Sequence, residues 1–306
     1  WVLGNLLWIS GFPIYQLVHW WICYLILTIG GERLELSRVL RPAPQQIRAF
    51  GILALALLAG TILSLFNANG GARLSGFAML ALSLWFLKND LAARNIHHPI
   101  PLTRYIAYCL FAGFIWMGVG GALQLIYGAT YAGPLYDAAL HTVFVGFVMS
   151  MIFGHAPIIF PAILGAPIKF YPAFYAHLAL LHFSLLLRVT GDLTNQVELR
   201  KFGGLLNEVA ILTFLGMTVY SVLRGTRYIM PTLTRWFLQA ALSYLLFALV
   251  AGVLLVSSVS KFITGFFPAY FHMLTFGWLT QLIFGVAFWM FPKYSIAKPR
   301  GHEWLG

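Results

Sequence analysis

Apolar runs of about 20 residues recur along the whole 306-residue chain, and this hydropathy pattern constrains the fold more than any other feature. A helix needs roughly 20 apolar residues to cross the hydrocarbon core of a bilayer. Charged residues make up 9% of this chain, whereas a soluble domain usually carries about 25%. The sequence therefore predicts an all-α, polytopic transmembrane helix bundle that lies in a lipid bilayer.

The apolar runs predict nine spans in a single transmembrane domain covering residues 1–306. The predicted spans are residues 14–30, 48–66, 72–88, 104–127, 134–157, 168–188, 203–223, 234–258 and 266–292. Residues 1–11 fit the end of a further helix, and the chain opens on Trp1 rather than on Met. We therefore expect the bundle to continue beyond the given residues at both ends.

Basic residues give the predicted orientation, because the cytoplasmic loops of membrane proteins are enriched in Lys and Arg. Of the 19 Lys and Arg residues, 14 lie in or beside the first, third, fifth and seventh connections and in the C-terminal tail. These segments, including the tail, are predicted to be cytoplasmic. Their basic residues also account for the net charge of +11, so no nucleic-acid partner is expected.

Two spans share a pattern in which a histidine leads a long apolar run. His141 and His272 are each followed by x4-Gly-aromatic-x4-Ile-Phe-Gly, and each lies 20 positions before a proline. The preceding spans match at Tyr108-x2-Phe-Ala and Tyr244-x2-Phe-Ala, and a similar interval leads back to His19 in the first span. The pattern predicts repeated four-helix units, at roughly residues 1–100, 101–230 and 231–306.

An ionisable residue inside a membrane span is by default a candidate for function. His141 and His272 lie about seven residues into their spans, or about 10 Å at 1.5 Å per residue. His19 lies at a comparable depth. The three histidines are therefore candidates for binding one heme or metal. The alternative is a neutral histidine whose ring is hydrogen-bonded to a backbone carbonyl.

Three further histidines lie in the fifth and sixth spans. His155 follows His141 by 14 residues, about 40° short of four α-helical turns, so the two are predicted to share one face. His155 fits a ligand, a gate or a packing residue, and Pro157 is expected to perturb the helix there. His177 and His182 are five residues apart and point about 140° away from each other, so only one can face a given metal.

Charged residues in the spans suggest two further interpretations. Glu208 is an acid in the seventh span, where it fits a proton relay or an ion pair with a basic group. Glu32, Arg33, Glu35 and Arg38 have spacings that favour ion pairs within one helix. These four residues are therefore assigned no chemistry.

The run from His272 to Lys293 reads His-x4-Gly-Trp-x6-Gly, then an aromatic-rich turn and Pro-Lys. It resembles the tenth helix of the catalytic subunits of heme–copper oxidases, in particular the cbb3-type oxidases and nitric oxide reductases. It is also similar to the heme- and copper-binding NnrS proteins. The oxidase superfamily is built from three four-helix units, and its second, sixth and tenth helices would correspond to residues 14–30, 134–157 and 266–292.

The resemblance implies that the chain binds b-type heme in a bacterial-type inner membrane. It makes His272 an axial ligand of a low-spin heme, with His19 as the opposite ligand. His141 would lie where the family has its first copper ligand, or would itself bind heme. His155 is a further candidate heme ligand.

The sequence departs from the family at two places. Tyr270 stands where the family has a second histidine, which holds the high-spin heme. The family's adjacent histidine pair that binds copper is absent, and the sixth span offers only His177 and His182 as metal ligands. These departures disfavour an intact centre for reducing oxygen or nitric oxide.

The expected function is electron transfer between a quinol pool and a partner redox protein. The expected partners are other subunits of a membrane redox complex, with a cytochrome c or a quinone as electron carrier. Two alternatives stay open: an NnrS-like heme or copper protein of nitric oxide metabolism, and a cofactor-free membrane anchor or transporter.

Overall fold

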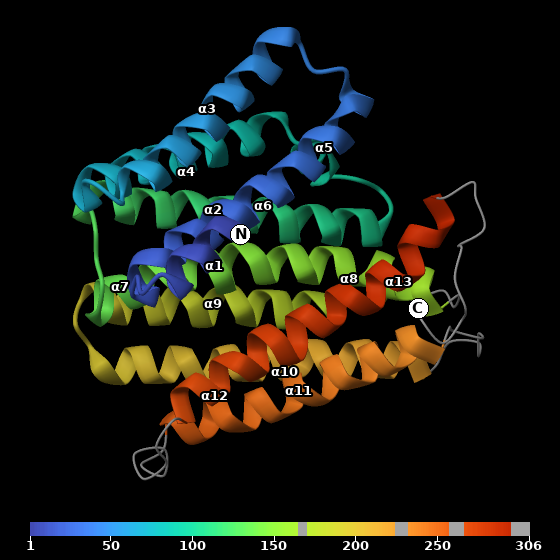
Figure 1. Ribbon diagram of the computed structural model, residues 1–306. Helices are drawn as coiled ribbons and strands as arrows, with labels where there is room; N and C mark the ends of the chain where they lie inside the picture. The colour runs from blue at the N-terminus through green and yellow to red at the C-terminus, as the bar shows by residue number, and fades with distance from the viewer. Residues whose placement is uncertain (165–169, 224–231, 257–265, 295–306) are drawn as a thin grey trace. The chain divides into compact units, whose positions relative to one another are not determined.

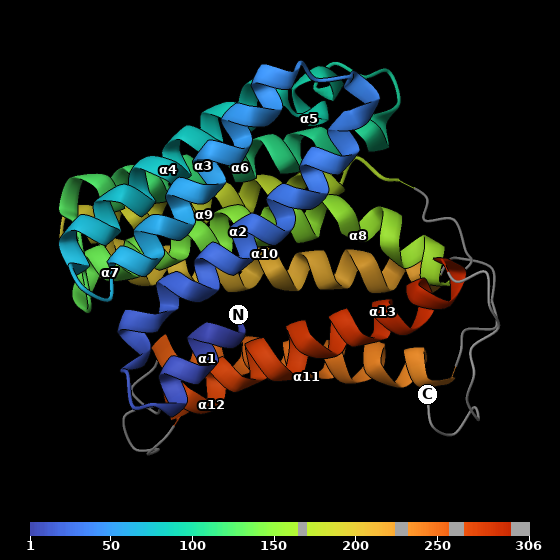
Figure 2. The same ribbon diagram turned by 45° about the horizontal axis from the view of Figure 1, so that its top comes forward.

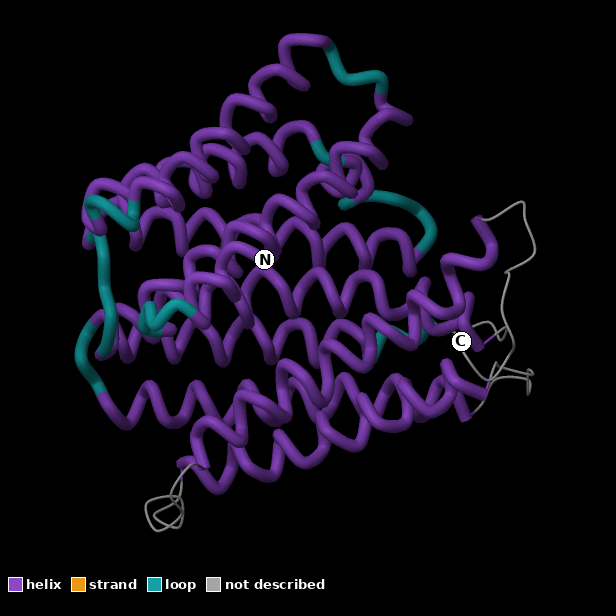
Figure 3. The backbone as a smooth tube through the Cα atoms, in the orientation of Figure 1, coloured by secondary structure: helices purple, strands orange, loops and turns teal. Residues whose placement is uncertain are grey.

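The computed structural model describes residues 1–164, 170–223, 232–256 and 266–294 (Figure 1). These residues are helical apart from short turns and loops (Figure 3). Within them, nine helices are long and apolar enough to cross a bilayer. The predicted all-α polytopic bundle is confirmed, and the protein is an integral membrane protein.

The helices keep the order expected from the hydropathy pattern. Their bounds are α1 Val2–Ile9, α2 Ile14–Leu36, η1 Ser37–Leu40, α3 Pro44–Leu63, α4 Ala68–Asn89, α5 Leu91–Asn95, α6 Pro101–Tyr127, α7 Gly133–His141, η2 Thr142–Val148, α8 Met149–Leu164, α9 Phe174–Leu193, α10 Val197–Leu223, α11 Thr232–Val256, α12 Phe266–His272, η4 Met273–Thr280 and α13 Gln281–Tyr294.

The sixth span shows how tertiary contacts move a predicted boundary. Hydropathy ends this span at Arg188, but α9 continues to Leu193. The Arg188 guanidinium is paired with Asp137, so a charged side chain no longer marks the end of the helix. The predicted boundary residues 168–169 and 257–258, and the tail at 295–306, lie outside the described residues.

The helix that contains His155 is longer than the sequence predicts. The predicted span ended at Pro157, where the helix was expected to be perturbed, but α8 runs from Met149 to Leu164. Proline removes one backbone donor, and membrane helices tolerate this where local adjustments satisfy the freed carbonyl. The predicted end at residue 157 is therefore wrong by about two turns.

The described chain divides into two compact units. The first contains residues 1–154 and 185–203, and the second contains the described parts of 155–184 and 204–306. Helices α8, α9 and α10 each contribute to both units. The compact units are defined by contacts between helices and do not coincide with the repeat units predicted from the sequence. The repeat units remain a prediction.

In the first unit, α3, α4 and α6 lie side by side (Figures 1 and 2). Phe86 of α4 stacks on Phe114 of α6 with ring centroids 4.7 Å apart. Small residues bring the same helices together: a Cβ on Gly76 would lie 2.6 Å from the Gly121 carbonyl oxygen. Membrane helices use such residues for close backbone approach.

A buried ion pair ties α2 to the start of α5 in the first unit. Arg33 donates from Nε and a terminal nitrogen to the two carboxylate oxygens of Asp90, at 2.9 and 2.6 Å. The expectation that Arg33 pairs within its own helix is wrong, because Asp90 reaches it from another helix. Arg38 and Glu35 do form the expected intrahelical pair, at 2.9 Å on the surface.

In the second unit, α11 packs along η4 and α13 (Figure 2). Phe237 of α11 stacks on Phe288 of α13, with ring centroids 5.6 Å apart. A buried hydrogen bond from the Ser184 hydroxyl to the Asn207 carbonyl oxygen joins α9 to α10. The helix that His272 leads, made of η4 and α13, lies against α11, the long helix before it in the chain.

Candidate functional site

A π-helical segment begins directly after each of the two repeat histidines. Thr142–Val148 follows His141 at the end of α7, and Met273–Thr280 follows His272 at the end of α12. π-Helical segments are rare in proteins and are frequent at functional sites. The sequence repeat is therefore also a repeat of local backbone geometry, with one copy in each compact unit.

The same hydrogen bond orients both histidine rings. His141 Nδ1 lies 2.9 Å from the Asp137 carbonyl oxygen, and His272 Nδ1 lies 2.7 Å from the Pro268 carbonyl oxygen. A carbonyl oxygen can only accept, so Nδ1 carries the proton in each ring. In the neutral ring Nε2 is then the lone-pair nitrogen, which is the tautomer of a histidine that ligates metal through Nε2.

The π-helical segments also decide which residues lie near the histidines along the helix. In an α-helix, His141 and Gly146 would be about 140° apart. Hydrogen bonds spaced by five residues instead bring residue i+5 to the same side of the helix as residue i. The histidine and the glycine of each motif are thereby brought to one face.

An aromatic residue from the neighbouring helix covers each of these glycines. A Cβ on Gly146 would lie 2.5 Å from the Cβ of Trp116 in α6, and a Cβ on Gly277 would lie 2.4 Å from the Cγ of Tyr244 in α11. The glycines thus leave room for a large ring at the level of the π-helical segment.

A second glycine in each motif fixes the register of the two helix pairs. Gly154 faces Cys109 and Gly285 faces Phe237, in each case with 3.1 Å between the added Cβ and the neighbour's Cβ. Trp116 lies seven residues after Cys109, and Tyr244 lies seven residues after Phe237. The two pairs are therefore packed in one register.

This register corrects the predicted alignment of the preceding helices. The sequence aligns Tyr108 with Tyr244, whereas the glycine contacts align Trp116 with Tyr244. The sequence alignment was wrong because it matched two tyrosines by identity. Tyr244 contacts Gly277, but the residue that contacts Gly146 is Trp116 and not Tyr108. Similar glycine contacts thus occur in both helix pairs, and the four-helix repeat units remain a prediction.

Substituting the first glycine of either motif is expected to destabilise the protein. Gly277→Ala adds a methyl group against the Tyr244 ring, and overpacking of this kind costs about 1–3 kcal/mol. Gly216→Ala in α10 is the matched control, because a Cβ there meets no atom within 4 Å. The free energy of unfolding in detergent should fall for Gly277→Ala only. Equal values for the two variants would contradict this packing.

His19 lies on α2 and His141 lies on α7, and both helices belong to the first unit. Its Nε2 atom is buried and has no hydrogen-bonding partner among the described residues. Tyr15 contacts Tyr131 with ring centroids 5.2 Å apart, so the start of α2 lies beside the segment that leads into α7. The structure thus brings the corresponding ends of the two helices together.

His272 belongs to the second unit, so its pairing with His19 or with His141 stays a prediction. His155 was predicted to share a face with His141. That prediction assumed α-helical rotation throughout, but seven of the intervening residues are π-helical. The shared face therefore does not follow from the spacing.

His177 is fully buried in α9, where its ring contacts Phe174 and Phe214 edge-on, with centroids 5.6 and 5.4 Å apart. His182, on the same helix, is half-buried. In the described part of the chain, no three His, Cys, Asp or Glu side chains gather as a group that could hold a metal ion. Copper binding by His141, His177 and His182 remains a prediction.

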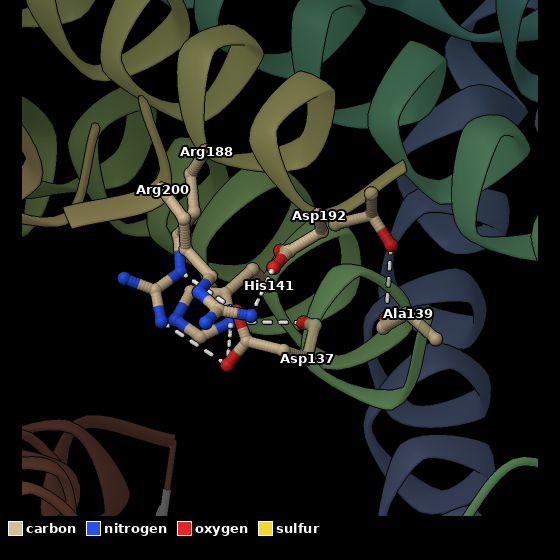
Figure 4. A network of polar contacts seen from close by, with 7 residues as sticks. Asp137, Ala139, His141, Arg188, Asp192 and Arg200 are labelled. Atoms are coloured by element: carbon tan, nitrogen blue, oxygen red, sulfur yellow. Dashed lines mark hydrogen bonds and ion pairs between the residues drawn. The ribbon is translucent and has the colours of Figure 1, made fainter. Parts of the chain in front are cut away.

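A network of charged side chains lies beside His141 in the first unit (Figure 4). Arg188 of α9 donates to both carboxylate oxygens of Asp137, at 2.9 and 3.1 Å. Asp137 also supplies the carbonyl oxygen that accepts from His141 Nδ1. The ion pair therefore holds the residue that orients the histidine.

Asp192 and Arg200 extend this network to α10. Arg200 lies 3.4 Å from Asp192, whose side chain is fully buried. Sequence reasoning missed Asp137, Arg188, Asp192 and Arg200 as a group. Their signal was present, because charged residues at the ends of apolar spans usually pair with one another or mark a functional site.

In the second unit, Glu208 pairs with the residue two positions before His272. Tyr270 donates from its hydroxyl to the Glu208 carboxylate at 3.3 Å. Gly252 of α11 provides the space, since a Cβ there would clash with the same carboxylate. A proton relay or an ion pair at Glu208 remains a prediction.

These features define a polytopic α-helical membrane protein with a repeated motif of a histidine followed by a π-helix. Residues 1–223 match the model of a family described as Domain of unknown function (DUF8744), and the chain belongs to this family. Comparisons with curated proteins and with solved structures give no match. The matched residues include the network of charged side chains, His19 and His141, and they end before α11.

Proposed function

We propose that the chain is a heme-binding membrane subunit that transfers electrons between a quinol pool and a partner redox protein. The proposal places it in a bacterial inner membrane, with its C-terminal tail in the cytoplasm. Its partners would be other subunits of a membrane redox complex, with a cytochrome c or a quinone as electron carrier.

One observation carries this proposal: two histidines at equivalent positions have the same orientation. In both rings a backbone carbonyl holds Nδ1 and leaves Nε2 as the lone-pair nitrogen. A structural histidine can make the same hydrogen bond to a carbonyl, so the proposal rests on its recurrence before a π-helical segment in both units. The buried Nε2 of His19 supports the proposal further, since buried polar atoms generally have a partner.

In this proposal the residues that would hold heme are His272, His19 and His141. Bound heme would supply one-electron chemistry. The chain's own residues orient the ligands. Asp137, held by Arg188, positions His141, and Pro268 positions His272 through its carbonyl oxygen.

A pyridine hemochrome assay on the purified full chain tests the proposal directly. The expected result is b-type heme together with a Soret band that shifts on reduction. A colourless preparation reconstituted with hemin that still binds none would overturn the proposal and favour an anchor or transporter. Copper in place of heme, with a response to nitric oxide titration, would favour an NnrS-like function instead.

A further inference from the structure

The carboxyl group of Asp192 is the most unusual polar group in the first unit. Its side chain is fully buried at the end of α9. Its Oδ2 atom is covered and accepts no hydrogen bond from any described residue. Its only described ion pair is a contact of Oδ1 with Arg200 at 3.4 Å, which is long for a charge-assisted hydrogen bond.

A second carboxyl group lies next to it. Figure 4 shows the Asp192 side chain pointing into the network that contains Asp137 and Arg188, where the two carboxyl groups interact with each other. Arg188 donates to both oxygens of Asp137 at 2.9 and 3.1 Å. The shorter contacts thus compensate the charge of Asp137, and the charge of Asp192 is compensated less well.

The two carboxyl groups can hydrogen-bond to each other if Asp192 carries a proton. Two ionised carboxylates cannot hydrogen-bond to each other, because neither is a donor. A carboxylic acid at Asp192 can donate its O–H to an oxygen of Asp137, and this removes a buried charge as well. Two adjacent carboxyl groups commonly share a proton in this way.

We propose that Asp192 is a proton-binding site, a carboxylic acid at neutral pH whose O–H donates a hydrogen bond to the carboxylate of Asp137. The charged or titratable groups around it are Asp137 and His141 from α7, Arg188 from α9 and Arg200 from α10. Arg200 is partly exposed, whereas the side chain of Asp192 is fully buried. The site stands on its own residues and does not depend on the proposed heme.

Infrared spectroscopy of the purified full chain tests the site, because only a protonated carboxyl group gives a carboxylic-acid carbonyl stretch. The wild type should show this band at neutral pH, and the band should move in D2O. Asp192→Asn should lose one carboxyl equivalent from it. Glu198→Gln, which changes an exposed carboxylate on α10, should leave the band intact. An Asp192→Asn spectrum equal to that of the wild type would overturn the proposal.

A second variant keeps the test independent of whether Asp192→Asn folds. Arg200→Gln retains both carboxyl groups and removes the cation that is paired with Asp192. Without this cation the acid form is favoured, so the band should persist to higher pH than in the wild type. A band with the same pH dependence in both proteins would show that the protonated group is not Asp192.

Discussion

Replacing His272 with alanine is expected to abolish the Soret band of the purified protein, or to convert it to a high-spin spectrum. The reason is that the imidazole Nε2, left free by the hydrogen bond from Nδ1 to the Pro268 carbonyl, would be a heme ligand in the proposed function. Heme content per chain and the reduced-minus-oxidised spectrum measure the effect.

The same measurement on His19→Ala and His141→Ala identifies which of these residues binds heme in addition to His272. One of these variants should reproduce the loss seen for His272→Ala, and the other should retain the low-spin spectrum. His97→Ala is the control, since His97 is exposed in the segment between α5 and α6. An unchanged heme spectrum in His272→Ala would refute the assignment of this residue.

Asp90→Ala is expected to cause the largest loss of stability among single charge substitutions. Both Asp90 and Arg33 are buried, with 1% and 6% of their surfaces exposed. Removing one partner of a buried ion pair leaves the other charge uncompensated and costs about 3–5 kcal/mol. Asp90 also accepts from the Ala92 backbone nitrogen at 2.7 Å, so the cap of α5 is lost with it.

Glu35→Ala provides the matched control for Asp90→Ala. It breaks the exposed pair with Arg38, which contributes about 0–1 kcal/mol. Unfolding in detergent gives the free energies of both variants. A double variant, Arg33→Leu with Asp90→Leu, should recover part of the stability, because no unpaired charge is then buried. A loss for Asp90→Ala no larger than that for Glu35→Ala would contradict the burial argument.

The positions of the spans could be predicted because hydropathy is a local property of the chain. Each of the nine apolar runs has to satisfy its own backbone hydrogen bonds in lipid, and a helix does so without help from other segments. The recurrence of His141 and His272 was visible for a similar reason, since it rests on residue identity alone.

The candidate site was predicted only in part. The sequence singled out the histidines and marked Asp137 and Arg188 as charged residues near span ends. It did not show that they pair, because they are 51 residues apart and meet only in the folded protein. The π-helical segments were missed as well. In an α-helix a histidine and a glycine five residues later point about 140° apart. The spacing therefore did not predict that the two residues share a face.

The sequence by itself determined that the protein is a helical membrane protein, where its spans lie and that one histidine motif recurs. The tertiary structure decided the register of the repeated pairs, the partners of Arg33 and Arg188, and the orientation of the histidine rings. The physical reason is the range of the interactions. Hydropathy and backbone satisfaction act within one helix, whereas glycine contacts and buried ion pairs exist only once two helices are packed together.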